Sequence, residues 1–303
     1  MEFYRSPEAR FHNLKDYPFK PQYININGLR MHYVDEGPKN ANPILLLHGA
    51  PSWSYVYRHI IPICALAGNR VIAPDLIGFG KSDKPKRIRD YSYQAHIDWM
   101  TAFILTLDLK QITLFGQDWG ALIGLRLAAE NEERFAGIII SNGMLLTGDQ
   151  KLPFAFKLWK YFALLSPWLP IDRIVNYACL KKLDKQERYA YRAPFPSAKF
   201  KAGVRAFPKL VPASPRNPAT QANREAWKVL EKWNKPLLTV FSDSDPFTRG
   251  GDKYLQKRIP GAKGQKHITL RGGHFIQEDA GEALAKIIIQ FVKKVNYELE
   301  QSI

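Results

Sequence analysis

The sequence has few cysteines and no long apolar run. Only Cys64 and Cys179 are present, far apart and with no spacing typical of a disulfide framework or a metal site. The apolar segments near residues 43–47 and 287–292 are too short to cross a bilayer. The first eleven residues lack the apolar stretch of a signal peptide. We therefore expect a cytoplasmic protein that has no metal, no cofactor and no membrane partner.

Acidic residues are scarce relative to basic ones. The chain has 44 Lys and Arg against 28 Asp and Glu, a formal net charge of +16. Such an excess can attract nucleic acids. The basic residues are dispersed, however, and no nucleic-acid-binding motif accompanies them. Many fall in one later region, as on a solvated face: Lys157, Lys160, Lys181, Lys182, Lys185, Lys199 and Lys201. We expect a monomer without a nucleic-acid partner.

The segment from Ile112 to Glu130 is the most informative stretch. It reads ITLFGQDWGALIGLRLAAE: an apolar run, a G-x-D-x-G pentapeptide from Gly116 to Gly120, and apolar residues at helical spacing. This pattern predicts a strand, a tight turn and a helix, and it resembles the nucleophile elbow of α/β-hydrolases. The central Asp118 would then stand exposed above the sheet. An aspartate that merely caps a helix N-terminus is the alternative.

A carboxylate at such a turn favours alkyl transfer over acyl transfer. A serine that attacked a saturated carbon would form an ether, which water cannot cleave. An aspartate would form an alkyl ester, and water can release the alcohol by attacking the aspartyl carbonyl. Asp118 therefore predicts a hydrolase that works on sp³ carbon in two covalent steps.

The rest of the chain alternates between strand and helix patterns. Alternating runs around Asn27 and Gly28 predict a hairpin, and apolar runs at 43–49, 70–75 and 135–142 predict buried parallel strands. Strands at 236–245 and 266–274 and a helix at 278–295 complete the pattern. We expect an α/β fold with a mostly parallel, doubly wound sheet. Residues 1–145 and 234–303 form its core, and 146–233 form an inserted helical cap over the ligand-binding ends of the strands.

Two later loops supply candidates for an acid and a base. In α/β-hydrolases the triad acid and histidine follow the nucleophile along the chain, and Asp245 and His274 occupy those places. Asp243 competes with Asp245, but we expect it to cap the turn. We expect His48 to bond its own loop and His267 to pack in a strand.

The chemistry assigns a role to each of these groups. His274 would take a proton from water, and Asp245 would hold its tautomer and stabilise the imidazolium. The backbone N–H groups of Ala50 and Trp119 would stabilise the negative charge on the tetrahedral intermediate.

Several motifs together resemble haloalkane dehalogenases over nearly the whole chain: HGAPSWSYVYR, NRVIAPDLIGFGKSDKP, QDWG, FSDSDPF and GGHFIQE, with APFP and AFPKLV in the cap. The resemblance implies that Asp118 displaces a halide held by two indole N–H groups, those of Trp119 and of Trp159 in the cap motif LWKYF. It also implies a substrate pocket, although each residue equally suits a core: Leu122, Phe156, Phe207, Pro208, Val211 and Phe247. The expected partners are a small haloalkane, water and a halide ion, and the products are a primary alcohol, halide and a proton.

The sequence departs from the family pattern at two places. Ala50 stands where relatives usually carry a polar side chain, so only its backbone N–H can act. Some subgroups place the triad acid after the strand that precedes the cap, where this chain has Ser141 and Asn142. The lack of a carboxylate at that place favours Asp245 as the triad acid.

Two other functions remain open at this point. Epoxide hydrolases share the aspartate elbow and the His/Asp pair, and they protonate the ring oxygen with two cap tyrosines. Candidates for these are Tyr161, Tyr177, Tyr189 and Tyr191. A non-catalytic receptor of the same fold need not keep nucleophile, acid and base together, and here all three are present.

Overall fold

An eight-stranded sheet forms the centre of the computed structural model, which describes residues 1–301. Its strand order is β10-β9-β8-β7-β4-β5-β3-β2. The pairs from β10 to β5 are parallel, and β2 and β3 pair antiparallel at one edge. The strands are β2 (Gln22–Ile26), β3 (Leu29–Glu36), β4 (Pro43–Leu47), β5 (Arg70–Pro74), β7 (Ile112–Gln117), β8 (Phe135–Ser141), β9 (Leu237–Ser242) and β10 (Ile268–Leu270). The mostly parallel sheet expected from the sequence is confirmed.

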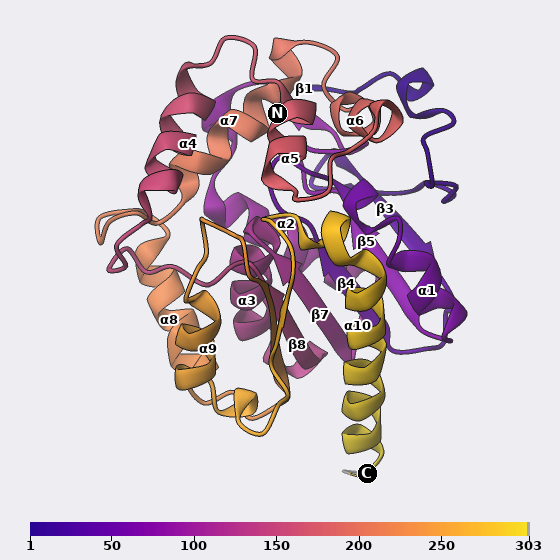
Figure 1. Ribbon diagram of the computed structural model, residues 1–303, viewed down its shortest axis with the longest axis vertical. Helices are drawn as coiled ribbons and strands as arrows, with labels where there is room; N and C mark the ends of the chain where they lie inside the picture. Colours follow the sequence, from indigo (N-terminus) through magenta and orange to yellow (C-terminus); the bar gives the residue numbers. More distant parts are fainter. Residues whose placement is uncertain (302–303) are drawn as a thin grey trace.

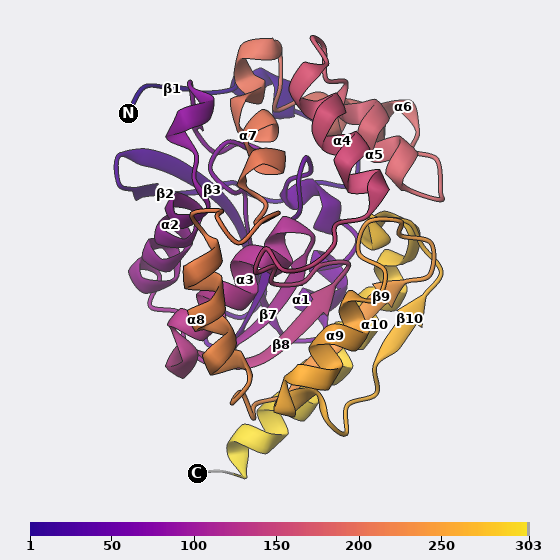
Figure 2. The same ribbon diagram turned by 90° about the vertical axis from the view of Figure 1, so that its left-hand side faces the viewer.

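Helices cover both faces of this sheet, as a doubly wound fold requires. Helices α1 (Ile61–Leu66) and α10 (Ile276–Glu300) pack together on one face. Helix α3 (Trp119–Glu130) lies on the other face between α2 (Tyr93–Thr106) and α8 (Thr220–Leu230) (Figure 2). Helix α9 (Gly251–Arg258) adjoins α8 through the rings of Trp227 and Tyr254. No helix in residues 1–301 is both long and apolar enough to span a membrane.

The hairpin between β2 and β3 forms at the expected dipeptide. Asn27 and Gly28 have positive φ angles of 52° and 82°, and Ile26 pairs with Leu29 across the turn. Asparagine and glycine accept this left-handed conformation more readily than other residues. The two-residue loop therefore fixes the register of the antiparallel edge.

A helical insertion separates β8 from β9. It begins with α4 (Phe154–Leu165), α5 (Ile171–Ala178), α6 (Lys185–Arg192) and α7 (Ala202–Leu210), which lie together above the strands, at the top of Figures 1 and 2. The last helix, α8, packs against α3 beside the sheet. The inserted cap is thus present, and the domain boundaries at residues 146 and 233 stay a prediction.

The N-terminal segment crosses onto this cap. Short strands β1 (Phe3–Tyr4) and β6 (Lys84–Pro85) pair antiparallel. The Ser6 hydroxyl donates to the Pro194 carbonyl at 2.6 Å, and the Lys15 ammonium lies 2.6 Å from the Asp184 carboxylate. Residues 3–15 therefore join the sheet layers to α6, a connection that the sequence pattern does not reveal.

Candidate active site

Asp118 occupies a strained turn between β7 and α3. Its φ and ψ are 52° and −120°, an uncommon conformation for a residue with a side chain. A Cβ on Gly120 would lie 1.8 Å from the Leu47 carbonyl oxygen, and one on Gly116 would lie 2.6 Å from the Gly120 carbonyl oxygen. Only glycine fits at either position. The Asp118 side chain makes no helix-capping hydrogen bond, so capping does not explain this residue.

The loop after β4 passes directly beside the Asp118 carboxylate. The Ala50 backbone N–H donates to Oδ1 at 2.8 Å. A Cβ on Gly49 would lie 2.6 Å from Asp118 Cβ, so glycine permits this close approach. The Ala50 N–H thus contacts the carboxylate, and the oxyanion role of both Ala50 and Trp119 stays a prediction.

His274 lies between two carboxylates. Its Nδ1 is 3.2 Å from Asp245 Oδ1, and its Nε2 is 3.6 Å from Asp118 Oδ2. Burial alone would lower the pKa of His274, but the charges and hydrogen bonds of Asp245 and Asp118 outweigh it and raise the pKa to about 10. The two carboxylates thus favour the imidazolium form of His274.

Asp245 is fixed by more than the histidine. It is buried and accepts hydrogen bonds from the Phe247 N–H at 2.9 Å and from the Thr248 hydroxyl. Burial acts to raise its pKa, but the His274 charge and these hydrogen bonds prevail and lower it. The carboxylate therefore stays ionised and orients the imidazole.

The competing residues have structural partners elsewhere. Asp243 is exposed and accepts from the Ser244 hydroxyl in its own turn at 2.8 Å and from the Gly272 N–H of the loop after β10 at 3.2 Å. The His48 Nε2 accepts from a backbone N–H at 3.0 Å, which leaves Nδ1 to donate to the Gly49 carbonyl at 2.9 Å. His267 accepts from the Thr239 N–H at 3.1 Å. The structure brings Asp118, Asp245 and His274 together and leaves these three outside.

One of the two glycines before His274, Gly273, makes room for the cap. The His274 ring itself packs against the rings of Phe247 and Phe275, each at 5.1 Å between ring centroids. A Cβ on Gly273 would lie 2.3 Å from the Ala178 carbonyl oxygen, to which the His274 N–H donates at 2.8 Å. Glycine is needed because cap helix α5 ends against the histidine loop.

Two polar residues outside the predicted triad position this loop. The Gln117 side-chain amide donates to the His274 carbonyl at 3.0 Å, and the Asn142 amide donates to the same oxygen at 2.9 Å. Asn142 also accepts from the Ser242 N–H at 3.0 Å, which joins the ends of β8 and β9 to the loop. Their place immediately after or at the end of buried strands was the available signal.

The two candidate halide donors come from the elbow and the cap. Trp119 is buried and contacts Phe207 of α7 at 4.4 Å between ring centroids. Trp159 is half-buried on α4, which packs against α7. Both indole N–H groups donate to no group within residues 1–301, whereas those of Trp53 and Trp227 donate to backbone carbonyls. Trp119 and Trp159 thus keep free donors.

The expected pocket residues lie on several elements of the core and the cap. They come from α3, α4, α7 with its C-terminal end, and the loop after β9: Leu122, Phe156, Phe207, Pro208, Val211 and Phe247. Of these, Phe207 contacts Trp119 and Phe247 contacts His274. Contact with substrate stays a prediction for all six. In the described part of the chain, no three His, Cys, Asp or Glu side chains form a metal-binding group.

Comparison with known proteins gives first the class and then the family. Residues 42–281 match the model of the alpha/beta hydrolase fold, which the sheet, the elbow and the inserted helices also define. The chain is 52% identical to a haloalkane dehalogenase of Psychrobacter cryohalolentis over 298 residues, covering 96% of this chain and 98% of the relative. Another, from Mycolicibacterium paratuberculosis, is 50% identical over 296 residues, with 96% and 98% covered.

A solved structure agrees with these relatives. The tetrameric haloalkane dehalogenase from Paraglaciecola agarilytica NO2 superposes with a TM-score of 0.88 at 33% identity, covering 94% of this chain and 97% of that one. The chain belongs to the haloalkane dehalogenases, hydrolases that act on carbon–halide bonds.

Proposed function

We propose that this dehalogenase works through an alkyl ester on Asp118. A carboxylate oxygen of Asp118 attacks the halogen-bearing carbon, a C–O bond forms, and the halide leaves with the electron pair of the C–X bond. The observation that carries this proposal is the Asp118 carboxylate itself, held in a strained turn between the Ala50 N–H at 2.8 Å and the His274 imidazole at 3.6 Å.

Water then hydrolyses the ester. His274 takes a proton from water, the hydroxide adds to the Asp118 carbonyl carbon, and the Ala50 N–H stabilises the resulting oxyanion. Collapse of this intermediate expels the alkoxide, which takes up a proton and leaves as the alcohol. The balance is one haloalkane and one water converted to alcohol, halide and a proton.

The charges around His274 support this order of steps. In the free enzyme two carboxylates raise the pKa of His274 to about 10, so the imidazole is protonated and a poor base. Alkylation makes Asp118 neutral and removes one of these charges, which lowers the pKa of His274. The first step therefore prepares the base for the second.

For the leaving halide we propose the indole N–H groups of Trp119 and Trp159, the two-tryptophan arrangement. An indole N–H donates without being able to accept, which suits an anion. Support comes from the free donors on both residues and from Phe207, which contacts Trp119 on the helix that packs against α4.

The positions of the four cap tyrosines argue against epoxide hydrolysis. Tyr161 and Tyr177 are 66% and 88% exposed, and the Tyr191 hydroxyl donates to the Glu278 carboxylate. The Tyr189 ring lies under the guanidinium groups of Arg10 and Arg192. None of these contacts places a tyrosine hydroxyl beside Asp118.

A substrate panel tests this proposal. We expect the purified enzyme to release bromide and protons in equal amounts from 1-bromobutane and 1,2-dibromoethane, and to form no diol from styrene oxide. Asp118→Asn should abolish bromide release. Diol formation without bromide release would support the epoxide reaction instead.

The expectation of a monomer without a nucleic-acid partner remains a proposal. The net charge of +16 supports the monomer, because copies of the chain repel one another, and the dispersal of the basic residues argues against a nucleic-acid partner. The Paraglaciecola relative is described as a tetramer. Sedimentation of this protein distinguishes the two states.

A further inference from the structure

Helix α4 exposes a continuous apolar row on the outside of the cap. Phe154, Leu158, Tyr161 and Leu165 follow the spacing of one helical face and are 79%, 61%, 66% and 77% exposed. Trp168, just after the helix, is 80% exposed. We name these five residues the apolar stripe. Isolated exposed apolar residues are ordinary, but a contiguous row marks an interaction surface.

The charge around the apolar stripe has one sign. Residues 150–171 contain three lysines, Lys151, Lys157 and Lys160, and no aspartate or glutamate. Lysines beside an aromatic and aliphatic helical face are the composition of a helix that lies in the surface of an anionic membrane. The net charge of +16 adds a long-range attraction to such a surface.

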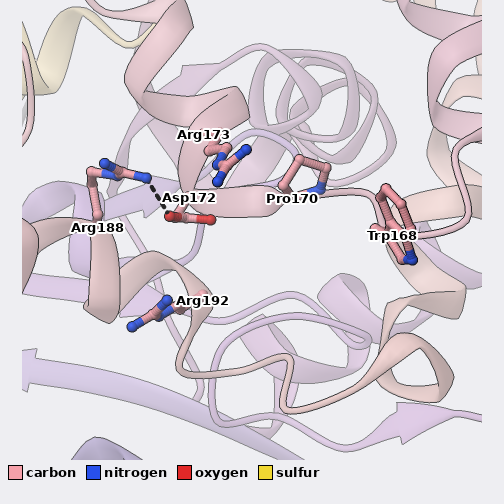
Figure 3. Close-up of a pocket in the computed structure, with 6 residues that line it drawn as sticks. All are labelled: Trp168, Pro170, Asp172, Arg173, Arg188 and Arg192. Atoms are coloured by element: carbon pink, nitrogen blue, oxygen red, sulfur yellow. Dashed lines mark hydrogen bonds and ion pairs between the residues drawn. The ribbon is translucent and has the colours of Figure 1, made fainter.

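A hollow rich in arginine adjoins the apolar stripe. It measures about 360 Å³ and is lined by Trp168, Pro170, Asp172, Arg173, Arg188 and Arg192 (Figure 3). Figure 3 shows Arg188 and Arg192 on one side and Trp168 on the other. Trp168 thus belongs both to the apolar stripe and to the hollow.

The cations of the hollow exceed its anions. Arg188 pairs with Asp172 at 2.9 Å, and no carboxylate in residues 1–301 pairs with Arg173 or Arg192. The Nε of Arg188 is buried without a hydrogen-bond partner in the same part of the chain. Guanidinium groups bind phosphate oxygens through paired hydrogen bonds, so this hollow suits a phosphate group.

We propose that the cap binds the surface of anionic phospholipid membranes. The apolar stripe enters the boundary between headgroups and acyl chains, and the arginine hollow takes a lipid phosphate. Trp168, with an apolar ring and a polar N–H, lies at the interface between the two. Haloalkanes are apolar and dissolve in lipid, so a bound enzyme would meet its substrate where the substrate is concentrated.

The charges favour a membrane over a second copy of the chain. Two copies that met through the apolar stripe would bring together six lysines and no acidic residue from residues 150–171. An anionic membrane neutralises the same lysines. The proposal revises the expectation of no membrane partner, because the sequence pattern of α4 does not tell which face is left exposed.

Vesicle flotation tests the proposal directly. We expect the full-length enzyme to float with phosphatidylcholine vesicles that contain about 30% phosphatidylglycerol, and binding to pure phosphatidylcholine to be roughly tenfold weaker. Raising the salt from about 0.15 M to 0.5 M should reduce binding, because it screens the lysines and arginines. Equal binding to both vesicles, or none, would overturn the proposal.

Two double variants test the two parts of the proposed membrane-binding surface, the apolar stripe and the arginine hollow. Leu158→Gln with Leu165→Gln alters the apolar stripe, and Arg173→Glu with Arg192→Glu alters the hollow. Each pair should lower binding to anionic vesicles roughly tenfold. Binding at the wild-type level by either pair would contradict the assignment of that part of the surface, and binding by both would overturn the proposal.

A control separates this site from general charge attraction. Lys263→Glu with Lys286→Glu changes the net charge by the same amount as the arginine pair, at exposed positions of the sheet layers. This control should retain binding within about twofold of the wild type.

Bromide release from 1-bromobutane and urea unfolding show that each variant is folded. If the leucine variant dissociates an oligomer in sedimentation while vesicle binding is unchanged, the apolar stripe is a contact between copies and the proposal fails.

Discussion

The imidazole of His274 links the two carboxylates of the site. Asp245 accepts at Nδ1 and Asp118 lies at Nε2, at 3.2 and 3.6 Å. Each carboxylate also has a backbone N–H donor of its own, from Phe247 and Ala50. Three charged groups are therefore oriented in a largely buried space, where their interactions are stronger than in water.

This arrangement predicts a dependence of stability on pH. The pKa of His274 is raised from 6.5 to about 10 on folding, so the imidazolium stabilises the fold fully below pH 6.5. This contribution is lost as the pH rises through about 10. Between pH 7 and 10 we expect the wild type to lose on the order of 2 kcal/mol more unfolding free energy than His274→Phe, measured in urea.

At acidic pH the stability of the fold changes in the opposite direction. Folding lowers the pKa of Asp245, so the carboxylate stabilises the fold above the ordinary pKa of an aspartate, and this stabilisation is lost as the pH falls. For the alkaline range, the contradicting result is an unfolding free energy that changes equally with pH in the wild type and in His274→Phe between pH 7 and 10. Such a result would mean that the imidazole does not interact with its carboxylates.

At the residue scale, the sequence predicts the three side chains that the structure brings together, Asp118, Asp245 and His274. Asp118 is marked by its two glycines, and Asp245 and His274 by their places after strands. The places of Gln117 and Asn142 at the ends of buried strands point to the site, but their partner was not recognisable, since their hydrogen bonds go to the backbone of a residue more than 130 positions away. The need for glycine at position 273 was not recognisable for the same reason, because the Ala178 carbonyl that it accommodates belongs to the cap.

Helix α4 divides its residues between two environments. Phe156 and Trp159 face the rest of the cap and are half-buried, while the apolar stripe faces outwards. The apolar spacing predicts the helix from the sequence, but both faces are apolar. For this reason the sequence alone does not decide which tryptophan or phenylalanine faces the substrate.

Trp159→Phe tests the inner face of α4. Loss of the indole N–H removes one halide donor, so carbon–halogen cleavage should slow by roughly 10 to 100-fold while hydrolysis of the ester changes little. Rapid-quench measurement of bromide and butanol separates the two steps. Trp168→Phe, on an exposed tryptophan of the same region, should leave both unchanged. If Trp159→Phe slows carbon–halogen cleavage and ester hydrolysis equally, the assignment of Trp159 to the halide site is contradicted.

At the element scale, strands with continuous apolar runs or a clear turn were predictable. The hairpin at Asn27 and Gly28 and the buried strands β4, β7 and β8 appear where the sequence indicates them. The two-residue strands β1 and β6 are too short to show a periodicity. Helix α8 falls within the cap predicted at residues 146–233, and its contact with α3 depends on tertiary packing that the sequence pattern does not show.

A buried ion cluster joins the cap to the sheet layers. Arg58 lies 2.5 Å from Glu278 of α10 and 3.2 Å from Glu187 of α6, and its side chain is fully buried. The Tyr191 hydroxyl donates to Glu278 as well. This cluster links α6 to the sheet layers, and so does the N-terminal segment at residues 3–15. The cap is therefore anchored at α6.

Replacing Arg58 tests this anchor. Arg58→Met leaves the buried Glu278 carboxylate without its cation and removes one of the two cations beside Glu187, which keeps Lys15 at 3.3 Å. We therefore expect a loss of about 3–5 kcal/mol in the free energy of unfolding. Arg89→Met, at an exposed arginine, should change it by about 0.5 kcal/mol or less. Urea unfolding measures both. A change in Arg58→Met no larger than in Arg89→Met would contradict the role of the cluster.

The central claim for the whole molecule is that Asp118 is alkylated and that His274 releases the product. The most direct measurement is mass spectrometry of the peptide containing Asp118, after His274→Phe has been incubated with 1-bromobutane. We expect one bromide released per enzyme molecule and a butyl group on Asp118, because the base that activates water is missing. Butanol formed at the wild-type rate, or an Asp118 peptide without the butyl group after bromide release, would contradict the account.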